Sequence, residues 1–462
     1  MKLTIIHTND VHSNFDNFAK AATLIKQLKN DHTLLLDGGD FADFKSIELQ
    51  GTRGIAAVEL LESVSYDALT IGNNEMFNGV QTLEYMAGSS SFPFISNNLL
   101  KKDRTPIHGV CSSTIISKNG LRILITGASP DLGVFCDGLG IAITPYKEAI
   151  LEEIHRNKGK YDLCLLLSHL GTFVDEVLAE EIPEIDIIIS AHDHKLFPEA
   201  KIINNTIINS AGNYGEHVGV LEVEVESRTI ILLRSESIAT QHVEKDAEIL
   251  SILGTNKEKA IRVLSQPLYT LHQPLWHDVV EENPLTNLIA DGLRDMLQCD
   301  IGLINSGICN AGIFHDVSKK KLIEVCPSPL NPTYFEIQGK FLKAALQQSL
   351  DSQKCLEDGR GLGFRGRFLG KLHISGGEVV HDGKEIIEVR IGGRVMEEES
   401  WYSVSSSDYL QRGSGYESLA NNRNAKYFPE EIKDVIRMYA DQNTFAAASY
   451  ENHENRWKNI LF

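Results

Sequence analysis

Five short polar segments follow apolar runs in the first half of the chain, and their side chains are of the types that bind divalent metals. The segments are 7–12, 37–40, 72–75, 168–169 and 190–194. Asp and His are ligands for Zn²⁺, Mn²⁺ or Fe. Because the carboxyl ends of strands in an open α/β sheet face one crevice, we expect these segments to converge on one site, although they lie far apart in the sequence.

The spacing within the segments predicts a particular geometry. Asp10 and His12 are one residue apart, as are His192 and His194, and an extended backbone would place each pair on one side. Asp40 follows two glycines, which permit a sharp turn that lets its carboxylate bridge two ions. Two metals about 3.5–4 Å apart can clamp a phosphoryl oxygen and convert water into a nucleophile near neutral pH. A single histidine more often has a structural role, but the complete ordered set is difficult to produce by chance.

The elements that must position these residues are predicted by hydrophobic periodicity. Residues 1–235 alternate short apolar runs with helix-favouring stretches such as 17–29, 55–63 and 145–156, the pattern of βα units with largely buried sheets. We expect an α/β domain over 1–238, a charged linking helix within 239–268 and a second, α+β domain over 269–462. Helices are predicted at 287–298 and 339–349 of that second domain.

Composition excludes several other classes of protein. The chain has 462 residues, 42% apolar and 23% charged, as in soluble globular proteins, and its net charge of −19 disfavours nucleic-acid binding. No stretch reaches the roughly 18 apolar residues of a membrane span. The N-terminus reads as a strand rather than a secretory signal, and the seven cysteines are scattered without a CxxC pair. We expect a cytoplasmic location with no membrane or nucleic-acid partner. The oligomeric state is left open.

The motifs resemble those of the 5′-nucleotidase family, in which a calcineurin-like metallophosphoesterase domain precedes a C-terminal nucleotide-binding domain. Segments 7–12, 39–40, 72–73, 168–171 and 191–194 carry the resemblance, and 211–219 is similar to the strand and turn that follow. The chain is identified as a bacterial cytosolic-type member, which implies a four-layer β-sandwich flanked by helices. The resemblance implies two divalent ions, Mn²⁺ or Zn²⁺, with Fe as a further option. Their ligands would be Asp10, His12, Asp40 and His194 for the first ion, and Asp40, Asn73, His169 and His192 for the second.

The resemblance continues into the second half through segments 282–291, 305–307, 368–376, 408–410 and 413–416. It implies that two aromatic residues, Phe368 and Tyr409, hold the nucleotide base between them, a contact that tolerates any base. Either ring could instead fill the core. Asn305 is expected to contact substrate, and so are Arg365 and Arg367, because arginine suits phosphate.

The family's third motif is Gly-Asn-His-Glu with an Asp three residues after the His, and this chain departs from it. Asn74 replaces the His and Phe77 replaces the Asp. Asn can donate a hydrogen bond to a phosphoryl oxygen but cannot act as a general acid, whose loss costs about 10²–10⁴ in rate. The change favours a leaving group that is already a stable anion, as in a phosphoanhydride, or slow cleavage of monoesters.

A second departure lies in the C-terminal half. Residues 308–310 read Ile-Cys-Asn where the family has an arginine that holds the substrate, and Ser414 stands near a family Asp. Arg360 and Arg412, with Arg365 and Arg367, either compensate or are simply solvated.

Three functions remain open at this point. The first is a two-metal phosphohydrolase of nucleotides, in which a metal-bound hydroxide attacks and Asn74 is the catalytic hydrogen-bond donor. The second is a pyrophosphohydrolase or phosphodiesterase acting on a nucleotide sugar or a cyclic nucleotide. The third is a nucleotide-binding pseudoenzyme, which the loss of the His–Asp dyad favours and the complete ligand set disfavours.

Overall fold

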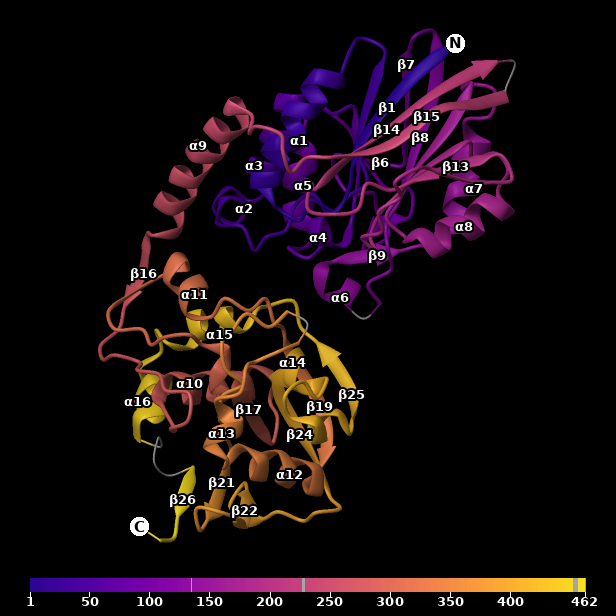
Figure 1. Cartoon of the computed structure of the whole chain (residues 1–462). Helices are drawn as coiled ribbons and strands as arrows, with labels where there is room; N and C mark the ends of the chain where they lie inside the picture. The colour runs from indigo at the N-terminus through magenta and orange to yellow at the C-terminus, as the bar shows by residue number, and fades with distance from the viewer. Residues whose placement is uncertain (134, 227–228, 362, 452–455, 462) are drawn as a thin grey trace. The chain divides into compact units, whose positions relative to one another are not determined.

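The computed structural model describes residues 1–133, 135–226, 229–361, 363–451 and 456–461. The chain divides into two compact units, Met1–Val263 (unit 1) and Leu264–Phe462 (unit 2), which are drawn in Figure 1. Each unit has hydrophobic core clusters made of its own residues. Within the described ranges, no helix has the length and apolar character that a membrane crossing requires.

Seven strands form the first sheet of unit 1. β1 pairs with β2 in parallel, the pairing continues in parallel to β6, and β14 and β15 extend the other edge in antiparallel orientation. In order across the sheet the strands are β15 (Thr229–Ala239), β14 (His217–Glu226), β1 (Lys2–Thr8), β2 (Thr33–Asp37), β3 (Ala68–Thr70), β4 (Phe94–Ile95) and β6 (Val110–Cys111).

Six strands form the second sheet. Its four central strands are parallel, and one antiparallel strand lies at each edge. In order they are β12 (Lys201–Ile203), β13 (Thr206–Asn209), β11 (Ile187–Ser190), β10 (Leu163–Ser168), β8 (Leu121–Ala128) and β7 (Ser113–Lys118).

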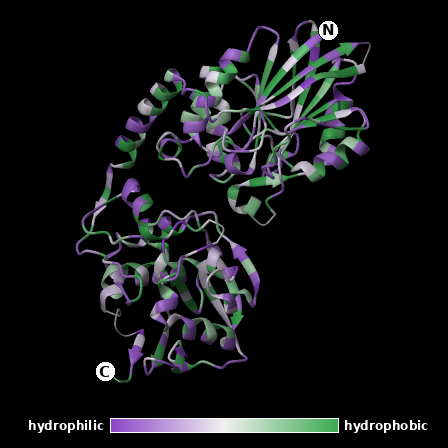
Figure 2. Cartoon of the chain, viewed as in Figure 1, coloured by the Kyte–Doolittle hydropathy of each residue, from purple (hydrophilic) through white to green (hydrophobic). Residues whose placement is uncertain are grey.

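The two sheets face each other, and helices cover their outer faces. Because strand side chains alternate, Leu34 and Leu36 of β2 point into the layer between the sheets, whereas Leu35 packs against helices. Figure 2 shows hydrophobic residues along the strands of unit 1, and the core clusters place such residues on both faces of the first sheet. The predicted four layers are therefore confirmed. The helices on the first sheet are α1 (Phe15–Leu28), α2 (Ile47–Thr52), α3 (Ile55–Val64) and α5 (Val80–Ser89), and those on the second are α7 (Tyr146–Arg156) and α8 (Thr172–Glu181).

Short elements complete unit 1. They are α4 (Asn73–Met76), α6 (Phe135–Leu139) and the two-stranded pair β5 (Leu99–Lys101) and β9 (Ile141–Ile143).

A long helix, α9 (Ala247–Leu264), ends unit 1. The sequence predicts this helix as a separate linking segment, but it packs on unit 1. Ile249 is fully buried there, and Asn256 Nδ2 donates a 2.5 Å hydrogen bond to Glu59 Oε2. All of α9 except its last residue therefore belongs to unit 1.

Unit 2 combines three small sheets with helices, the mixture that the sequence predicts. The five-stranded sheet has the order β20 (Leu372–Ser375), β17 (Ile301–Asn305), β24 (Trp401–Ser407), β19 (Pro332–Gln338) and β25 (Asn422–Tyr427). The four-stranded sheet has β23 (Arg394–Val395), β22 (Ile386–Ile391), β21 (Gly377–His381) and β26 (Trp457–Asn459), and the two-stranded sheet has β16 (Pro267–Thr270) and β18 (Asp316–Ser318).

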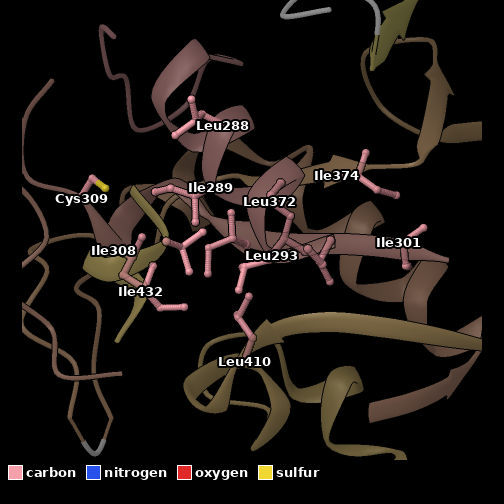
Figure 3. Packing of buried hydrophobic residues seen from close by; sticks show 14 of the residues in the cluster. Leu288, Ile289, Leu293, Ile301, Ile308, Cys309, Leu372, Ile374, Leu410 and Ile432 are labelled. Atoms are coloured by element: carbon pink, nitrogen blue, oxygen red, sulfur yellow. The ribbon is translucent and has the colours of Figure 1, made fainter. Parts of the chain in front are cut away.

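The central helix of unit 2 is α10 (Pro284–Leu297), which begins three residues before the predicted start. Asn283 caps it by accepting from Thr286 N, and proline suits the first turn of a helix because it needs no donor there. Leu288, Ile289 and Leu293 of α10 belong to the same core cluster as the sheet residues shown in Figure 3. The other helices are α11 (Lys319–Val325), α12 (Gly339–Ser349), α13 (Ser352–Cys355), α14 (Asp408–Gln411), α15 (Ile432–Tyr439) and α16 (Asn443–Glu451).

Candidate metal centre

The seven predicted metal ligands follow the ends of five parallel strands, drawn from both sheets of unit 1. Parallel strands that end together bring the residues after them to one edge of the sandwich. The residues are Asp10 and His12 after β1, Asp40 after β2, Asn73 after β3, His169 after β10, and His192 and His194 after β11.

The backbone at five of these residues is left-handed rather than extended. Asp10 and His12 have φ values of 52° and 48°, Asp40 has 55°, and His192 and His194 have 84° and 59°. The predicted reason for the Asp-x-His and His-x-His spacing, strand alternation, is therefore wrong, because each pair lies in a tight turn. Left-handed non-glycine residues cost about 1–3 kcal/mol each and persist where the surrounding structure holds them.

The predicted sharp turn before Asp40 is present, with Gly39 at φ +92°. A Cβ on Gly39 would lie 2.8 Å from His169 Nδ1, and one on Gly72 would lie 2.2 Å from Asp40 Oδ1. Glycine is required at both positions because the loops approach one another this closely.

The side-chain nitrogen and oxygen atoms of five of these residues lie within a few ångströms of one another. His12 Nε2 is 2.9 Å from His194 Nε2, and Asp10 Oδ1 is 3.8 Å from the Nε2 atoms of His12, His169 and His194. Asp40 Oδ2 lies 3.6 Å from His12 Nε2 and 3.4 Å from His169 Nε2. Two groups have all their ligand atoms within 4.8 Å: Asp10, His12 and His194, and Asp10, Asp40 and His169. Both carboxylates thus lie between the histidines.

Two buried atoms test whether these residues suit a cation. His169 Nδ1 is 2.7 Å from the carbonyl oxygen of Gly38, which can only accept, so Nδ1 donates and Nε2 is the ring atom that faces the carboxylates. His169 Nε2 and Asn73 Oδ1 are buried and have no hydrogen-bond partner in the described structure. Leaving such atoms unsatisfied is costly, and a divalent cation would satisfy both, so the residues fit a metal.

The pKa shifts of the clustered side chains also indicate that the site suits a cation. Burial alone would lower the pKa of His169, but the carboxylates of Asp40 and Asp10 raise it to about 10. Burial likewise opposes ionisation of Asp40, yet His169 and His12 hold its pKa below the usual range. The negative field that attracts a proton to His169 also attracts a metal ion.

His192 lies at the edge of this cluster. Its backbone N–H donates to Asp10 Oδ2 at 3.0 Å, and its ring centroid is 5.1 Å from that of His169 in an edge-to-face arrangement. His192 therefore adjoins the five clustered residues, and the role of Asn73, at the start of α4, stays a prediction.

Asn74, the predicted catalytic residue, contacts two of the ligands. Its side-chain amide donates to Asp40 Oδ2 at 2.7 Å and lies 3.1 Å from His12 Nδ1, and its backbone N–H donates to Asp40 Oδ1 at 2.7 Å. Phe77 is exposed three residues later. The substituted motif is thus adjacent to the metal ligands.

Several supporting residues were missed by sequence reasoning. Asn9 Nδ2 donates to Asp10 Oδ2 at 2.9 Å and to Gly212 O at 2.7 Å, while Asn9 Oδ1 accepts from Ala211 N at 2.9 Å. Partners of this kind fix the orientation of a ligand. The available signal was position, because Asn9 stands between the recognised residues of the first segment.

Glu75 has the same function for the second segment. It is fully buried and accepts from the backbone N–H groups of Asp40, Ala42 and Gly72 at 2.9–3.0 Å. Burial, with a smaller contribution from Asp40, raises its pKa to about 7. Glu75 thereby holds the Asp40 loop against the start of α4.

A buried carboxyl also supports the loops from the second sheet. Asp175 of α8 accepts a hydrogen bond from Ser190 Oγ, at the end of β11. Burial raises the pKa of Asp175 to about 7, with partial opposition from the hydroxyls of Ser168 and Ser190. These serines immediately precede the segments that carry His169 and His192, so Asp175 ties both strand ends to α8.

The two aromatic residues predicted to hold the base, Tyr409 and Phe368, have different surroundings in unit 2. Tyr409 is fully buried and stacks on Phe364, with centroids 4.5 Å apart, and its hydroxyl donates to Arg360 O at 3.3 Å. Phe368 is half-buried and lies beneath the guanidinium of Arg367, 4.9 Å from its centroid. The structure therefore places the ring of Phe364, rather than that of Phe368, against Tyr409, because the loop containing Phe364 folds onto α14.

The remaining unit 2 candidates lie around the same loop. Asn305 is buried and its Nδ2 donates to Leu369 O at 2.6 Å, whereas its Oδ1 has no partner in the described structure. Arg365 is exposed, and its Nη1 donates to Phe364 O at 3.1 Å. Arg412 pairs with Asp408 at 2.7 Å. The role of these residues in substrate binding stays a prediction.

Comparison with known proteins gives matches over both units. Residues 3–196 match the family model described as calcineurin-like phosphoesterase, and residues 264–421 match the model described as 5′-nucleotidase, C-terminal domain. The chain is 32% identical to the uncharacterized metallophosphoesterase YunD of Bacillus subtilis, over 94% of this chain and 98% of the relative. It is 25% identical to a 5′-nucleotidase of Vibrio cholerae, over 97% and 92% respectively. The solved structure of Haemophilus influenzae NAD nucleotidase has the same fold, with a TM-score of 0.67 and 14% identity over 99% of both chains.

Proposed function

The chain belongs to the 5′-nucleotidase family of calcineurin-like metallophosphoesterases and is a phosphoric ester hydrolase, and we propose that it hydrolyses nucleotides at two divalent metal ions in unit 1. The observation that supports this most strongly is the convergence of Asp10, Asp40 and three histidine Nε2 atoms, with His169 Nε2 buried and unsatisfied. When bound there, two cations would clamp phosphoryl oxygens and lower the pKa of a water molecule. Mn²⁺ and Zn²⁺ suit this mixed N/O donor set, and Fe is a further option.

The residues of the site can bind and orient the phosphoryl group. A neutral His12 that uses Nε2 as a ligand carries its proton on Nδ1 and accepts nothing from Asn74. The Asn74 amide then keeps one hydrogen on Asp40 Oδ2, at 2.7 Å, and its other hydrogen would have to turn away from His12 Nδ1, 3.1 Å away, to reach a phosphoryl oxygen. In this proposal Asn74 binds the phosphoryl group, and it supplies no proton to the leaving group.

The replacement of the His–Asp dyad by Asn74 and Phe77 favours a second candidate function. Because Asn74 and Phe77 cannot protonate an alkoxide, a leaving group that departs as a stable anion is the better substrate. Pyrophosphate bonds of nucleotide sugars meet this condition, and cyclic nucleotides or other diesters test the broader phosphodiesterase alternative. The pseudoenzyme alternative predicts nucleotide binding without turnover.

A substrate panel tests these proposals. The purified chain would be stripped of metal, reloaded with Mn²⁺ or Zn²⁺, and assayed for phosphate release from a nucleoside monophosphate, and for cleavage of a cyclic nucleotide and a nucleotide sugar. We expect metal-dependent turnover that His192→Ala abolishes, and faster monoester cleavage in Asn74→His by up to about 10². Bound metal without turnover of any nucleotide would contradict the hydrolase proposal and favour the pseudoenzyme.

We also propose a cytoplasmic location, which the seven free cysteines support. Fractionation of cells that produce the full chain would test it, and recovery outside the cytoplasm would contradict it.

A further inference from the structure

A cavity of about 470 Å³ lies in unit 2, between α10 and α16. Its volume falls within the range of small-molecule sites, about 300–1,000 Å³. The two helices pack against each other (Figure 1), and the carboxyl end of β20 and Arg456 complete the lining. The described lining contains neither the metal ligands nor the aromatic residues predicted to hold the base. The cavity therefore belongs neither to the metal centre nor to the loop around Tyr409.

Four polar residues of α10 face the cavity, and their spacing is that of one helix face. At positions i, i+3, i+4 and i+7 these are Asp291, Arg294, Asp295 and Gln298. The core face of the same helix carries Leu288 and Leu293 instead. The polar face of an amphipathic helix usually lies in open solvent, whereas α16 packs beside this one. The charged side chains of α10 thus border a space between two helices.

Arg294 presents a fixed guanidinium to this cavity. Its Nε donates to Asp300 O at 3.0 Å, and the group lies against Gly376, where a Cβ would be 2.5 Å from Nε and 2.8 Å from Cζ. Glycine at 376 therefore leaves the space that the guanidinium occupies. Among the described residues, no carboxylate forms an ion pair with Arg294, so its two Nη groups remain available. A guanidinium held in this way suits a carboxylate, which it can bind through two parallel hydrogen bonds.

A buried hydroxyl lies at the same end of the cavity. Ser375 lines the cavity and is only 5% exposed, and it immediately precedes Gly376, against which the Arg294 guanidinium lies. Within the described part of the chain, the Ser375 Oγ has no hydrogen-bond partner. Leaving a buried hydroxyl without a partner is costly. A ligand that binds Arg294 would supply the missing partner.

A negative charge borders the cavity from another side. Asp295 Oδ2 accepts from the hydroxyl of Tyr439, at the end of α15, at 3.0 Å, whereas the Arg294 guanidinium lies against the end of β20. The hydroxyl is neutral, and no lysine or arginine of the described residues pairs with Asp295, so its charge is uncompensated. Asp291 and Arg456, by contrast, neutralise each other at 2.7 Å. The cavity thus offers one unpaired positive and one unpaired negative group.

We propose that this cavity binds a free α-amino acid with an apolar side chain. The Arg294 guanidinium binds the α-carboxylate, with the Ser375 hydroxyl as a second donor, and Asp295 accepts from the α-ammonium. Phe445 and Ala448 of α16 provide the apolar surface for the side chain. An inorganic anion would leave Asp295 without a partner, and a metal ion would be repelled by Arg294. This binding is additional to the proposed hydrolysis and does not depend on it.

L-Leucine is the probe, and two analogues of the same shape each lack one of its charges. 4-Methylpentanoate lacks the ammonium group, and 3-methylbutylamine lacks the carboxylate. Equilibrium dialysis of the full chain against radiolabelled leucine should show one saturable site with a Kd below about 1 mM. Each analogue should compete at least about 10-fold more weakly than unlabelled leucine. Equal competition by either analogue would overturn the assignment of a zwitterion.

Substitutions in the lining locate the site. Arg294→Gln and Asp295→Asn each remove one charge and keep a polar side chain, and each should weaken leucine binding at least about 10-fold. Thr444→Phe fills the cavity from α16, whereas Ala447→Phe adds the same ring at an exposed α16 residue outside the lining. The first should abolish leucine binding and the second should leave it unchanged. Urea unfolding followed by tryptophan fluorescence would establish that unit 2 of each variant is folded.

The absence of saturable binding to the parent up to about 10 mM leucine would overturn the proposal. So would unchanged affinity in folded Arg294→Gln or Thr444→Phe. His169→Ala, which removes a predicted metal ligand, should bind leucine like the parent. If leucine binds but no nucleotide is hydrolysed, only the proposed function fails. If nucleotides are hydrolysed but leucine does not bind, only the amino-acid site fails.

Discussion

Two clusters of carboxylates, one in each unit, receive their compensating charge differently. In unit 2, Arg456 supplies it from within the chain: its guanidinium donates to Asp291 at 2.7 Å and lies 3.8 Å from Glu282. In unit 1, Asp10 and Asp40 are buried among histidines, and one of these keeps an unsatisfied ring nitrogen. A buried charge is costly unless it is paired. These carboxylates of unit 2 therefore have a cationic partner within the chain, whereas the centre in unit 1 is suited to a cation taken from solution.

The largest expected effect follows from removing a ligand in unit 1. His169→Ala deletes the buried ring that lies 3.4 Å from Asp40, and we expect activity to fall by at least about 10³, because metal ions contribute several kcal/mol to such reactions. Phosphate release and bound Mn²⁺ measured by mass spectrometry check this. His155→Ala, an exposed histidine on α7, is the matched control. Full activity in His169→Ala would mean that the cluster is not the reaction centre.

The complementary substitution removes Arg456, the positively charged side chain that pairs with carboxylates in unit 2. Arg456→Met removes the cation that pairs with Asp291, whereas Glu282 keeps its hydrogen bonds from Asn287 and the Trp457 backbone. Breaking a buried pair costs about 3–5 kcal/mol, which is the upper limit expected here. All three tryptophans lie in unit 2, so urea unfolding followed by tryptophan fluorescence reports on this unit. Exposed Arg390→Met should unfold like the parent, and bound Mn²⁺ should be unchanged in both variants. A loss of Mn²⁺ from Arg456→Met would mean that the two units are not independent in this respect.

A third way to bury a carboxyl is to keep its proton, and Asp175 illustrates it. Its folded pKa of about 7 lies above the ordinary 3.8, so the unfolded chain releases this proton first as the pH rises. Stability from the protonated group is full below about pH 4 and is lost as the pH rises through about 7. Between pH 5 and 8 the parent should lose about 2–3 kcal/mol relative to Asp175→Asn.

Hydrogen–deuterium exchange of β10 and β11 measures this difference in unit 1, which contains no tryptophan. Ser190→Ala provides a comparison, because it removes a hydroxyl donor to Asp175 without removing the carboxyl. An unchanged difference between parent and Asp175→Asn across this pH range would show that the carboxyl is already ionised in the fold.

The ligands were predictable from sequence because each follows a strand whose apolar run is local and periodic. His169 and His194 could be placed in one site by the rule for strand ends alone. The left-handed turns at Asp10 and His12 were not predictable, because they depend on hydrogen bonds from loops elsewhere: His12 N donates to Asp40 O at 2.8 Å. In unit 2 the burial of Tyr409 could not be predicted from local sequence, because it depends on Phe364, which lies 45 residues away along the chain.

The helices likewise include features that a local sequence signal predicts and features that depend on distant contacts. The start of α10 was readable from Asn283 and its following proline, a local signal that the periodicity missed. The docking of α9 on unit 1 had no local signal, because the contact between Asn256 and Glu59 spans 197 residues.

The sequence separation within the metal centre also constrains how the protein is made. His12 and His194 touch, yet they lie 182 residues apart. During synthesis the first ligands emerge from the ribosome long before the last, and contacts of such large separation form late in folding. The complete set of ligands therefore cannot assemble until β11 has been synthesised. A truncated or stalled product that lacks β11 would lack the complete centre.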